Sequence, residues 1–338
     1  MTLSIHEVAA SAVQARARIR AHIYQTPLIP ARHAGRDRDA TVLFKAENFQ
    51  LTGSFKLRGA TSKISAAQPA TATTTAAAAA DDDSKHRLIT ASSGNHGIGA
   101  AYAARALGRD LTVVLPETVF PAKLDKIHAY GATAILHGTE PGLAEQYAQR
   151  LAASGKYTYV SPYNDPLIVA GQGTIGLEIL EQCGAAGVDN VFISMGGGGL
   201  VGGVGAVLKA FSPATTVYGV AAANSKTLAE SIVAGRVLET EHRPTLAEAV
   251  AGGMDEDSIT LALAIAVVDR VVECDEEEIA AAMRKMAFEE NMIVEGSAAL
   301  ALAGFDKVAR EVAGQTSVIL LCGGNVDQGV VKKVLYGL

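Results

Sequence analysis

The 338-residue sequence contains no tryptophan and only three cysteines. The cysteines are odd in number and far apart, at Cys183, Cys274 and Cys322, so they form neither a disulfide framework nor a CxxC metal site. The histidines include no HExxH motif and no closely spaced pair, and we therefore expect no metal site. No uncharged apolar run reaches the length of about 18 residues that a transmembrane helix needs.

Neither sign of charge dominates the sequence. Its 29 basic and 35 acidic residues give a net charge of −6, which attracts neither a nucleic-acid backbone nor an anionic membrane. Residues 1–23 predict an amphipathic helix and lack the apolar core of a signal peptide. We expect a cytoplasmic protein without nucleic-acid or membrane partners.

Small aliphatic side chains and glycine are abundant instead. Hydrophobic residues make up 49% of the chain, aromatic residues 5%, and there are 34 glycines. Such a chain is too apolar to be disordered, and its length suggests about two domains. Alanine-rich helices and glycine-rich turns are typical of α/β proteins.

Short apolar strands alternate with helices along most of the sequence. The expected strands cover 24–30, 40–47, 87–91, 111–115, 134–137, 190–195, 216–222 and 317–322. The expected helices cover 59–67, 97–107, 122–130, 143–153, 173–183, 200–211, 278–290 and 296–313. This order predicts the α/β class, with parallel sheets covered by helices.

One low-complexity segment interrupts this pattern. Residues 67–86 consist mostly of alanine, threonine and aspartate, offer no apolar face to bury, and predict a solvated connection. We expect two doubly wound open-sheet domains, with the smaller one (87–156) inserted in the larger one (1–66 and 157–338).

Three glycine-rich turns follow predicted strands: SSGNHG (92–97), GGGG (196–199) and CGGN (322–325). In open α/β sheets, ligands bind beyond the carboxyl ends of the strands, where free N–H groups of turns and helix N-termini hold anions. The three turns therefore predict a ligand with separated polar groups.

The GxGxxG pattern of dinucleotide sites matches residues 197–202 and also residues 171–176. The pattern is weak alone, and an acid that binds the ribose hydroxyls is expected at the end of the next strand. Residues 217–224 contain no Asp or Glu, which favours a phosphate cradle over an NAD site. An NAD-linked oxidoreductase and a non-catalytic amino-acid-binding module stay open as alternatives.

Five motifs occur together in an order that resembles the serine/threonine dehydratase family: SFKLRGA (54–60), SSGNHG, AGQGT (170–174), GGGGL and CGGN. That family includes serine racemase and ammonia-lyases of 3-hydroxyamino acids, all fold-type II enzymes that use pyridoxal 5'-phosphate (PLP). The resemblance implies the fold-type II architecture, PLP as cofactor and an amino acid as substrate. We also expect a homodimer.

The resemblance assigns roles to individual residues. Lys56 would form the Schiff base with PLP, Asn95 would contact its ring hydroxyl and Cys322 would face its pyridine nitrogen. The full set of cofactor-binding positions is Phe55, Lys56, Asn95, Gly196, Gly197, Gly198, Gly199, Glu295 and Cys322. The substrate carboxylate would lie at Ser92, Gly94, Asn95 and His96. The expected catalytic residues are Lys56 and Ser93.

These residue types fit the chemistry of a PLP-dependent dehydratase, which is an ammonia-lyase. A lysine with a lowered pKa can act as nucleophile and general base, while PLP stabilises negative charge at Cα. We expect conversion of a 3-hydroxy-L-amino acid (threonine, serine or a bulkier one such as 3-phenylserine) to a 2-oxo acid and ammonia. A serine-type amino-acid racemase is the alternative, because Ser93 matches the second acid/base of serine racemase.

Three places depart from the family pattern. Ala221 and Thr227 stand where many relatives have the acids that hold a divalent cation, so the oxygen ligands of a hard cation are missing. Ala249 replaces a glycine on the far side of the cofactor ring, and Ser161 and Tyr163 lie where many relatives have His-Pro. These changes predict an altered side-chain pocket and no metal requirement.

Overall fold

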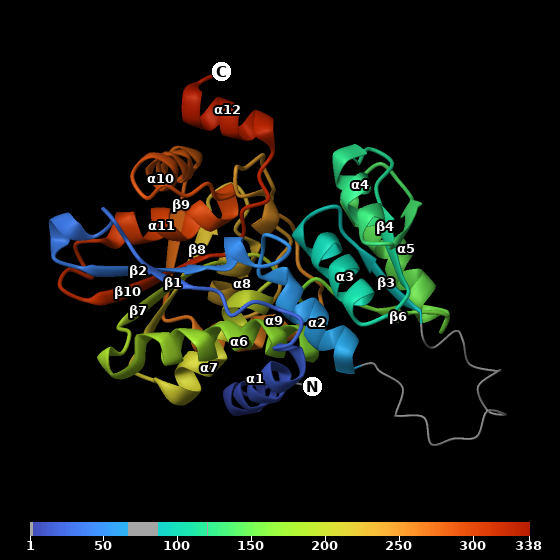
Figure 1. Cartoon of the computed structure of the whole chain (residues 1–338), viewed down its shortest axis with the longest axis horizontal. Helices are drawn as coiled ribbons and strands as arrows, with labels where there is room; N and C mark the ends of the chain where they lie inside the picture. The colour runs from blue at the N-terminus through green and yellow to red at the C-terminus, as the bar shows by residue number, and fades with distance from the viewer. Residues whose placement is uncertain (1–2, 67–86, 120) are drawn as a thin grey trace.

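The computed structural model describes residues 3–66, 87–119 and 121–338, which form two sheets covered by helices (Figure 1). The six-stranded sheet has the order β1-β2-β10-β7-β8-β9, and the four-stranded sheet has the order β5-β4-β3-β6. Neighbouring strands are parallel except β1 and β2, which are antiparallel. The predicted α/β class is confirmed. The predicted domain boundaries stay a prediction, and the low-complexity residues 67–86 lie outside the described residues.

The strands are short and mostly buried. Those of the larger sheet are β1 (Leu28–Pro30), β2 (Thr41–Ala46), β7 (Asn190–Ser194), β8 (Thr216–Ala222), β9 (Arg270–Cys274) and β10 (Thr316–Leu321). Those of the smaller sheet are β3 (Leu88–Ala91), β4 (Leu111–Leu115), β5 (Thr133–Leu136) and β6 (Thr158–Tyr159).

Helices cover both faces of the six-stranded sheet (Figure 1). One face carries α1 (Ile5–Ile19), α6 (Pro166–Cys183), α7 (Gly199–Phe211) and α9 (Ile259–Val267), and the other carries α10 (Glu276–Phe288) and α11 (Gly296–Val308). The remaining helices of this part are α2 (Lys56–Ala66), α8 (Thr227–Ala234) and α12 (Gln328–Tyr336). The smaller sheet is accompanied by α3 (Asn95–Ala106), α4 (Pro121–Ala129) and α5 (Pro141–Ala153). Single 3₁₀ turns cover Arg36–Arg38, Glu47–Phe49, Gly184–Ala186 and Glu248–Val250.

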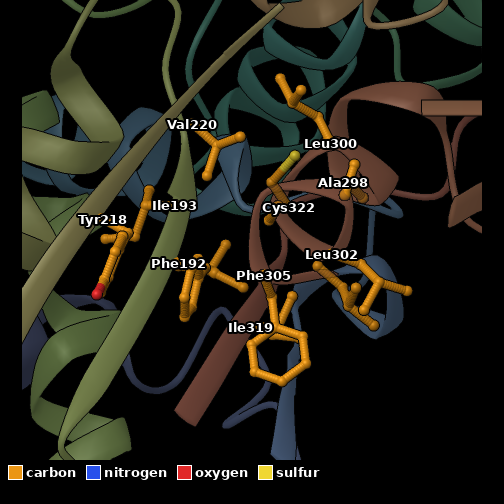
Figure 2. Packing of buried hydrophobic residues seen from close by; sticks show 14 of the residues in the cluster. Phe192, Ile193, Tyr218, Val220, Ala298, Leu300, Leu302, Phe305, Ile319 and Cys322 are labelled. Atoms are coloured by element: carbon orange, nitrogen blue, oxygen red, sulfur yellow. The ribbon is translucent and has the colours of Figure 1, made fainter. Parts of the chain in front are cut away.

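The main hydrophobic core lies on both faces of the six-stranded sheet, and Figure 2 shows residues of this cluster from the sheet and from α11. The ring of Phe192 on β7 stacks on Tyr218 of β8 at 4.4 Å and meets Phe305 of α11 edge-on at 5.5 Å. Cys322 follows β10 directly and belongs to the same core. None of the helices in the described ranges is long and apolar enough to span a lipid bilayer.

Two helices begin three or more residues earlier than the sequence predicts. α2 starts at Lys56, and α6 starts at Pro166 after Asp165, whose side chain accepts the N–H groups of the first turn. The second GxGxxG match, 171–176, therefore lies inside a helix and is not a nucleotide-binding loop. A Cβ on Gly171 would lie 2.6 Å from Cα of Gly59, so glycine is needed there for the close approach of α6 to α2.

A cluster of four buried charges, Lys45, Glu47, Arg58 and Glu178, fixes α2 to the six-stranded sheet and to α6. Nε of Arg58 donates to Glu47 at 2.8 Å, and Nη1 donates to Glu178 at 2.6 Å. Nζ of Lys45 donates to the other oxygen of Glu178 at 2.6 Å. All four side chains are at most 4% exposed, so protein partners rather than water compensate each charge. Because Arg58 lies in the first turn of α2, this ion cluster also fixes the position of Lys56.

Candidate active site

Lys56 extends its amine into a pocket beyond the ends of the central strands. Nζ donates to the carbonyl oxygen of Pro162 at 2.7 Å. Burial lowers the pKa of this amine to about 8, because the charged form loses hydration and forms no ion pair within the described ranges. Near neutral pH a fraction of Lys56 is therefore the uncharged, nucleophilic amine.

The tetraglycine turn forms one side of the same pocket. It connects β7 to α7, and no side chain caps the N-terminus of that helix. Gly198 has a φ of 85°, and a Cβ there would lie 2.8 Å from Oγ1 of Thr260. A Cβ on Gly197 would lie 2.5 Å from the ring of Tyr163. Glycine keeps the backbone open, and the free N–H groups at the start of α7 suit a phosphate group.

The other walls come from segments that are distant in the sequence. The complete lining is Phe55, Lys56, Pro162, Tyr163, Gln172, Ser194, Gly196, Gly197, Gly198, Gly199, Leu200, Val201, Ala249, Val250 and Cys322. The structure thus brings Phe55, Lys56, the four glycines and Cys322 together around one pocket, as expected from the sequence. Their individual binding roles stay predictions.

Asn95, Glu295 and Asn325 form a hydrogen-bonded group near Cys322. Nδ2 of Asn95 donates to both oxygens of Glu295, at 2.9 and 3.0 Å, and Oδ1 of Asn95 accepts from Nδ2 of Asn325 at 2.8 Å. Burial raises the pKa of Glu295 to about 7, and burial also raises the pKa of the Cys322 thiol well above its usual value. The thiol of Cys322 is therefore neutral at physiological pH.

The SSGNHG turn joins β3 to α3. The N–H of Gly94 donates to Oγ of Ser92 at 3.2 Å, and no side chain caps the N-terminus of α3. Ser93 lies half-buried between these two residues. The free N–H groups at the start of α3 are consistent with the predicted binding of a substrate carboxylate.

His96 directs its ring away from this turn. Nε2 lies 3.0 Å from both Oγ1 of Thr90 and the carbonyl oxygen of Val160. Burial lowers the pKa of the imidazole to about 3, so the ring is neutral. Any contact of His96 with the substrate carboxylate would therefore come from its backbone N–H group.

Three polar parts of the pocket are not predicted from the sequence, namely the carbonyl of Pro162, Gln172 and Ser194. Oε1 of Gln172 accepts the N–H of Gly59 at 3.2 Å and so connects α6 to α2. Oγ of Ser194 is buried and has no hydrogen-bond partner within the described part of the chain. Ser194 ends β7, and only Met195 separates it from the glycine turn; this position is the signal that could have identified it.

The segment predicted to alter the side-chain pocket contributes only in part. Tyr163 and Ala249 line the pocket, whereas Ser161 shapes the turn beneath it. Oγ of Ser161 accepts the N–H of Asn164 at 2.9 Å. Tyr163 is therefore the side chain through which this segment reaches a ligand.

Hydroxyl groups occupy the place where the family resemblance led us to look for cation ligands. Oγ1 of Thr227 lies 2.7 Å from Oγ1 of Thr240 and donates to the carbonyl oxygen of Gly252 at 3.2 Å, while Ala221 is buried. Over residues 3–66, 87–119 and 121–338, no three His, Cys, Asp or Glu side chains gather in a group that could hold a metal ion. Without a carboxylate, this place suits a hard cation poorly.

The donors around the pocket fit pyridoxal 5'-phosphate. The uncapped start of α7 suits its phosphate, the Lys56 amine suits its aldehyde, and the neutral Cys322 thiol can face its ring nitrogen. The ring of Phe55 lines the same space. No feature of the lining requires a nicotinamide cofactor.

Comparisons with known proteins agree with this assignment. The family model described as pyridoxal-phosphate dependent enzyme matches residues 19–323. The catabolic L-threonine dehydratase of Staphylococcus aureus (strain N315) is 37% identical over 333 residues, covering 96% of this chain and 91% of that protein. The crystal structure of threonine deaminase from T.th. is 35% identical with a TM-score of 0.82, covering 94% of this chain and 98% of that one. Maize serine racemase is 27% identical with a TM-score of 0.84, covering 100% of this chain and 98% of that one.

The family model spans most of the chain, and the dehydratase relative is similar along nearly its whole length. Four of the five motifs that carry the resemblance contribute residues to the pocket lining, and SSGNHG is the one that does not. The chain belongs to the fold-type II family of serine and threonine dehydratases among the pyridoxal-phosphate-dependent enzymes, and it is a PLP-dependent lyase.

Proposed function

We propose that this lyase is a dehydratase of 3-hydroxy-L-amino acids that forms a 2-oxo acid and ammonia. One observation carries the proposal: the Lys56 amine, with its lowered pKa, shares a pocket with the uncapped N-terminus of α7. Such an amine can attack and can remove protons near neutral pH beside a phosphate group. The threonine dehydratase and threonine deaminase relatives support threonine or serine as substrates. The bulkier 3-phenylserine is a third candidate.

Lys56 would perform two tasks in this reaction. PLP, when bound, supplies the electron sink for negative charge at Cα. Lys56 would hold PLP covalently until the substrate amine displaces it, and its free amine would then remove the Cα proton. The N–H groups of residues 92–95 would hold the substrate carboxylate and so direct the Cα–H bond toward Lys56. Loss of the β-hydroxyl as water and subsequent hydrolysis would give the 2-oxo acid and ammonia.

The neutral thiol of Cys322 favours elimination over slower proton exchange. A carboxylate beside the ring nitrogen would stabilise a proton there and strengthen the electron sink, whereas a neutral thiol does not. Negative charge at Cα is then less stabilised, so we infer that prompt departure of the β-hydroxyl is favoured over reprotonation.

Racemisation is the second candidate, and Ser93 is the residue that supports it. Lys56 serves one face of Cα, and inversion needs a proton donor on the other face. Serine racemase relatives and the half-buried place of Ser93 in the SSGNHG turn are consistent with that role. The variant Ser93→Ala should keep most turnover of L-substrates and lose turnover of D-substrates. An unchanged ratio of D- to L-substrate turnover would assign Ser93 to binding or to the turn alone.

A substrate screen tests the proposed function. The PLP-loaded protein is incubated with L-serine, L-threonine and L-threo-3-phenylserine, and the amounts of 2-oxo acid and ammonia are measured. We expect both products in equal amounts from at least one of the three. Turnover of none of the three would contradict the dehydratase proposal. The homodimeric state and cytoplasmic location stay predictions, and light scattering of the purified protein tests the first.

A further inference from the structure

We propose that Glu145 and Asp255 set the side-chain specificity of this site, so that it accepts neutral side chains and disfavours a second carboxylate. The inference rests on the proposed function, because it concerns the substrate of the same site. Neither residue belongs to one of the motifs that carry the family resemblance.

Glu145 approaches the site from the four-stranded sheet. It lies near the start of α5, at the edge where β5 ends and where the SSGNHG turn also begins. The neighbouring Ala144 is fully packed against this sheet, which fixes the helix. Oε1 of Glu145 accepts the hydroxyl of Tyr159 at 3.0 Å, and Tyr159 ends β6. The half-buried carboxylate interacts electrostatically with both Lys56 and Asp255, so it lies within reach of the charge that each of them carries.

Asp255 approaches from the other side. Its N–H donates to the hydroxyl of Tyr163 at 2.7 Å, and its Oδ2 accepts from Nδ2 of Asn164 at 2.9 Å. The ring of Tyr163 is in turn packed against Gly197 in the tetraglycine turn. Asp255 is thus held beside Tyr163, which lines the pocket.

No basic side chain among the described residues of the lining balances these two acids once PLP is bound. Lys56 is the only basic residue that the described lining contains, and PLP uses its amine. The nearby Lys63 is paired with Asp165 at 2.6 Å. A substrate with a carboxylate on its side chain would add a third negative charge in a partly desolvated space, where like charges repel more strongly than in water.

Paired ligands of equal shape test this inference. L-asparagine and L-aspartate differ by one charge and lack a β-hydroxyl, so binding can be measured by calorimetry on the PLP-loaded protein. We expect L-asparagine to bind at least about tenfold more tightly than L-aspartate. The variants Glu145→Gln and Asp255→Asn should each reduce this ratio about threefold, and the double variant should bring it near one. The amide introduced by Glu145→Gln keeps an acceptor for the hydroxyl of Tyr159, so the wall is preserved.

Glu256→Gln is the matched control. Glu256 is exposed and neighbours Asp255, and its substitution changes the net charge by the same amount as Glu145→Gln or Asp255→Asn. This control should leave the ratio unchanged. Equal binding of both ligands by the wild type, or an equal effect of Glu256→Gln, would overturn the inference. Turnover measurements distinguish this inference from the proposed function. We expect kcat/KM to be higher for L-threonine than for L-threo-3-hydroxyaspartate, and we expect the ratio of the two values to fall in Glu145→Gln. If both hydroxyamino acids are turned over with equal kcat/KM, this inference is contradicted and the dehydratase proposal is not. If the protein binds L-asparagine more tightly than L-aspartate but turns over no hydroxyamino acid, only the dehydratase proposal is contradicted.

Discussion

Two buried lysines of this molecule, Lys45 and Lys56, have opposite surroundings. Nζ of Lys45 donates to the carboxylate of Glu178 at 2.6 Å, to the carbonyl of Thr26 at 2.7 Å and to Oε1 of Gln182 at 3.0 Å. Nζ of Lys56 donates to one carbonyl and to no carboxylate in the part of the chain that the structure describes. Burial is common to both, so burial alone does not make a lysine reactive. The lack of a carboxylate partner distinguishes the reactive one.

The electrostatic consequence follows from the same contacts. Burial lowers the pKa of Lys45, but the adjacent carboxylates of Glu178 and Glu47 oppose it and hold the ammonium in an ion cluster. Burial lowers the pKa of Lys56 to about 8, and no carboxylate in the described part of the chain bonds to its amine. One lysine therefore stabilises the fold and the other is prepared to act as a base.

Substitution of each lysine in turn should separate these two roles, and the largest difference should be in catalytic turnover. Lys56→Ala should reduce turnover at least about 10⁴-fold and abolish covalent attachment of PLP, because nucleophile and general base are lost together. The fold should persist, since no described ion pair is broken. Lys45→Met, assayed at a temperature where it is folded, should keep turnover per folded molecule within a few-fold. An equal loss in both variants would contradict the assignment.

The free energy of unfolding should show the reverse order, with a larger loss in Lys45→Met than in Lys56→Ala. Lys45→Met leaves Glu178 with one cation fewer in a fully buried site, and breaking such a pair costs about 3–5 kcal/mol of the free energy of unfolding. Urea unfolding of both variants without PLP measures the difference. A loss below about 1 kcal/mol for Lys45→Met would show that the ion cluster is not the anchor of α2.

The pH dependence of stability sharpens the comparison further. The pKa of Lys56 is about 8 in the folded protein, and its ordinary value is 10.5. Between pH 8 and pH 10.5, Lys56 is therefore protonated in the unfolded chain and mostly unprotonated in the folded protein. Stability of the cofactor-free wild type should therefore gain from Lys56 as pH rises through this window. Lys56→Met should be more stable than wild type at pH 7, and this advantage should shrink by pH 10.5. A pH-independent difference between the two proteins would exclude a lowered pKa for Lys56.

The smallest expected effect is that of removing divalent cations. The contacts of Thr227 with Thr240 and Gly252 offer no carboxylate to a cation, so dialysis against EDTA should leave kcat and KM unchanged. A large loss of activity that Mg²⁺ or Ca²⁺ restores would show that another cation site supports the pocket.

Sequence alone predicts the fold class, the glycine turns and the lysine, because each leaves a local pattern. It does not predict that α6 begins at Pro166, since the glycines of AGQGT lower helix propensity and the reason for them is tertiary packing. Gly171 meets Gly59, and a Cβ on Gly173 would lie 3.0 Å from the carbonyl oxygen of Gly203. Glu145 lies on an ordinary helix, and only the folded chain brings it within electrostatic reach of Lys56.

The identity of the lysine that binds PLP is the most direct test of the contrast between Lys45 and Lys56. The holoenzyme is reduced with borohydride, which fixes the bond between lysine and cofactor, and is then digested and mapped by mass spectrometry. We predict a pyridoxyl label on Lys56, in the segment SFKLRGA, and none on Lys45. A label on Lys45 or on any other lysine, with Lys56 unmodified, would contradict the assignment.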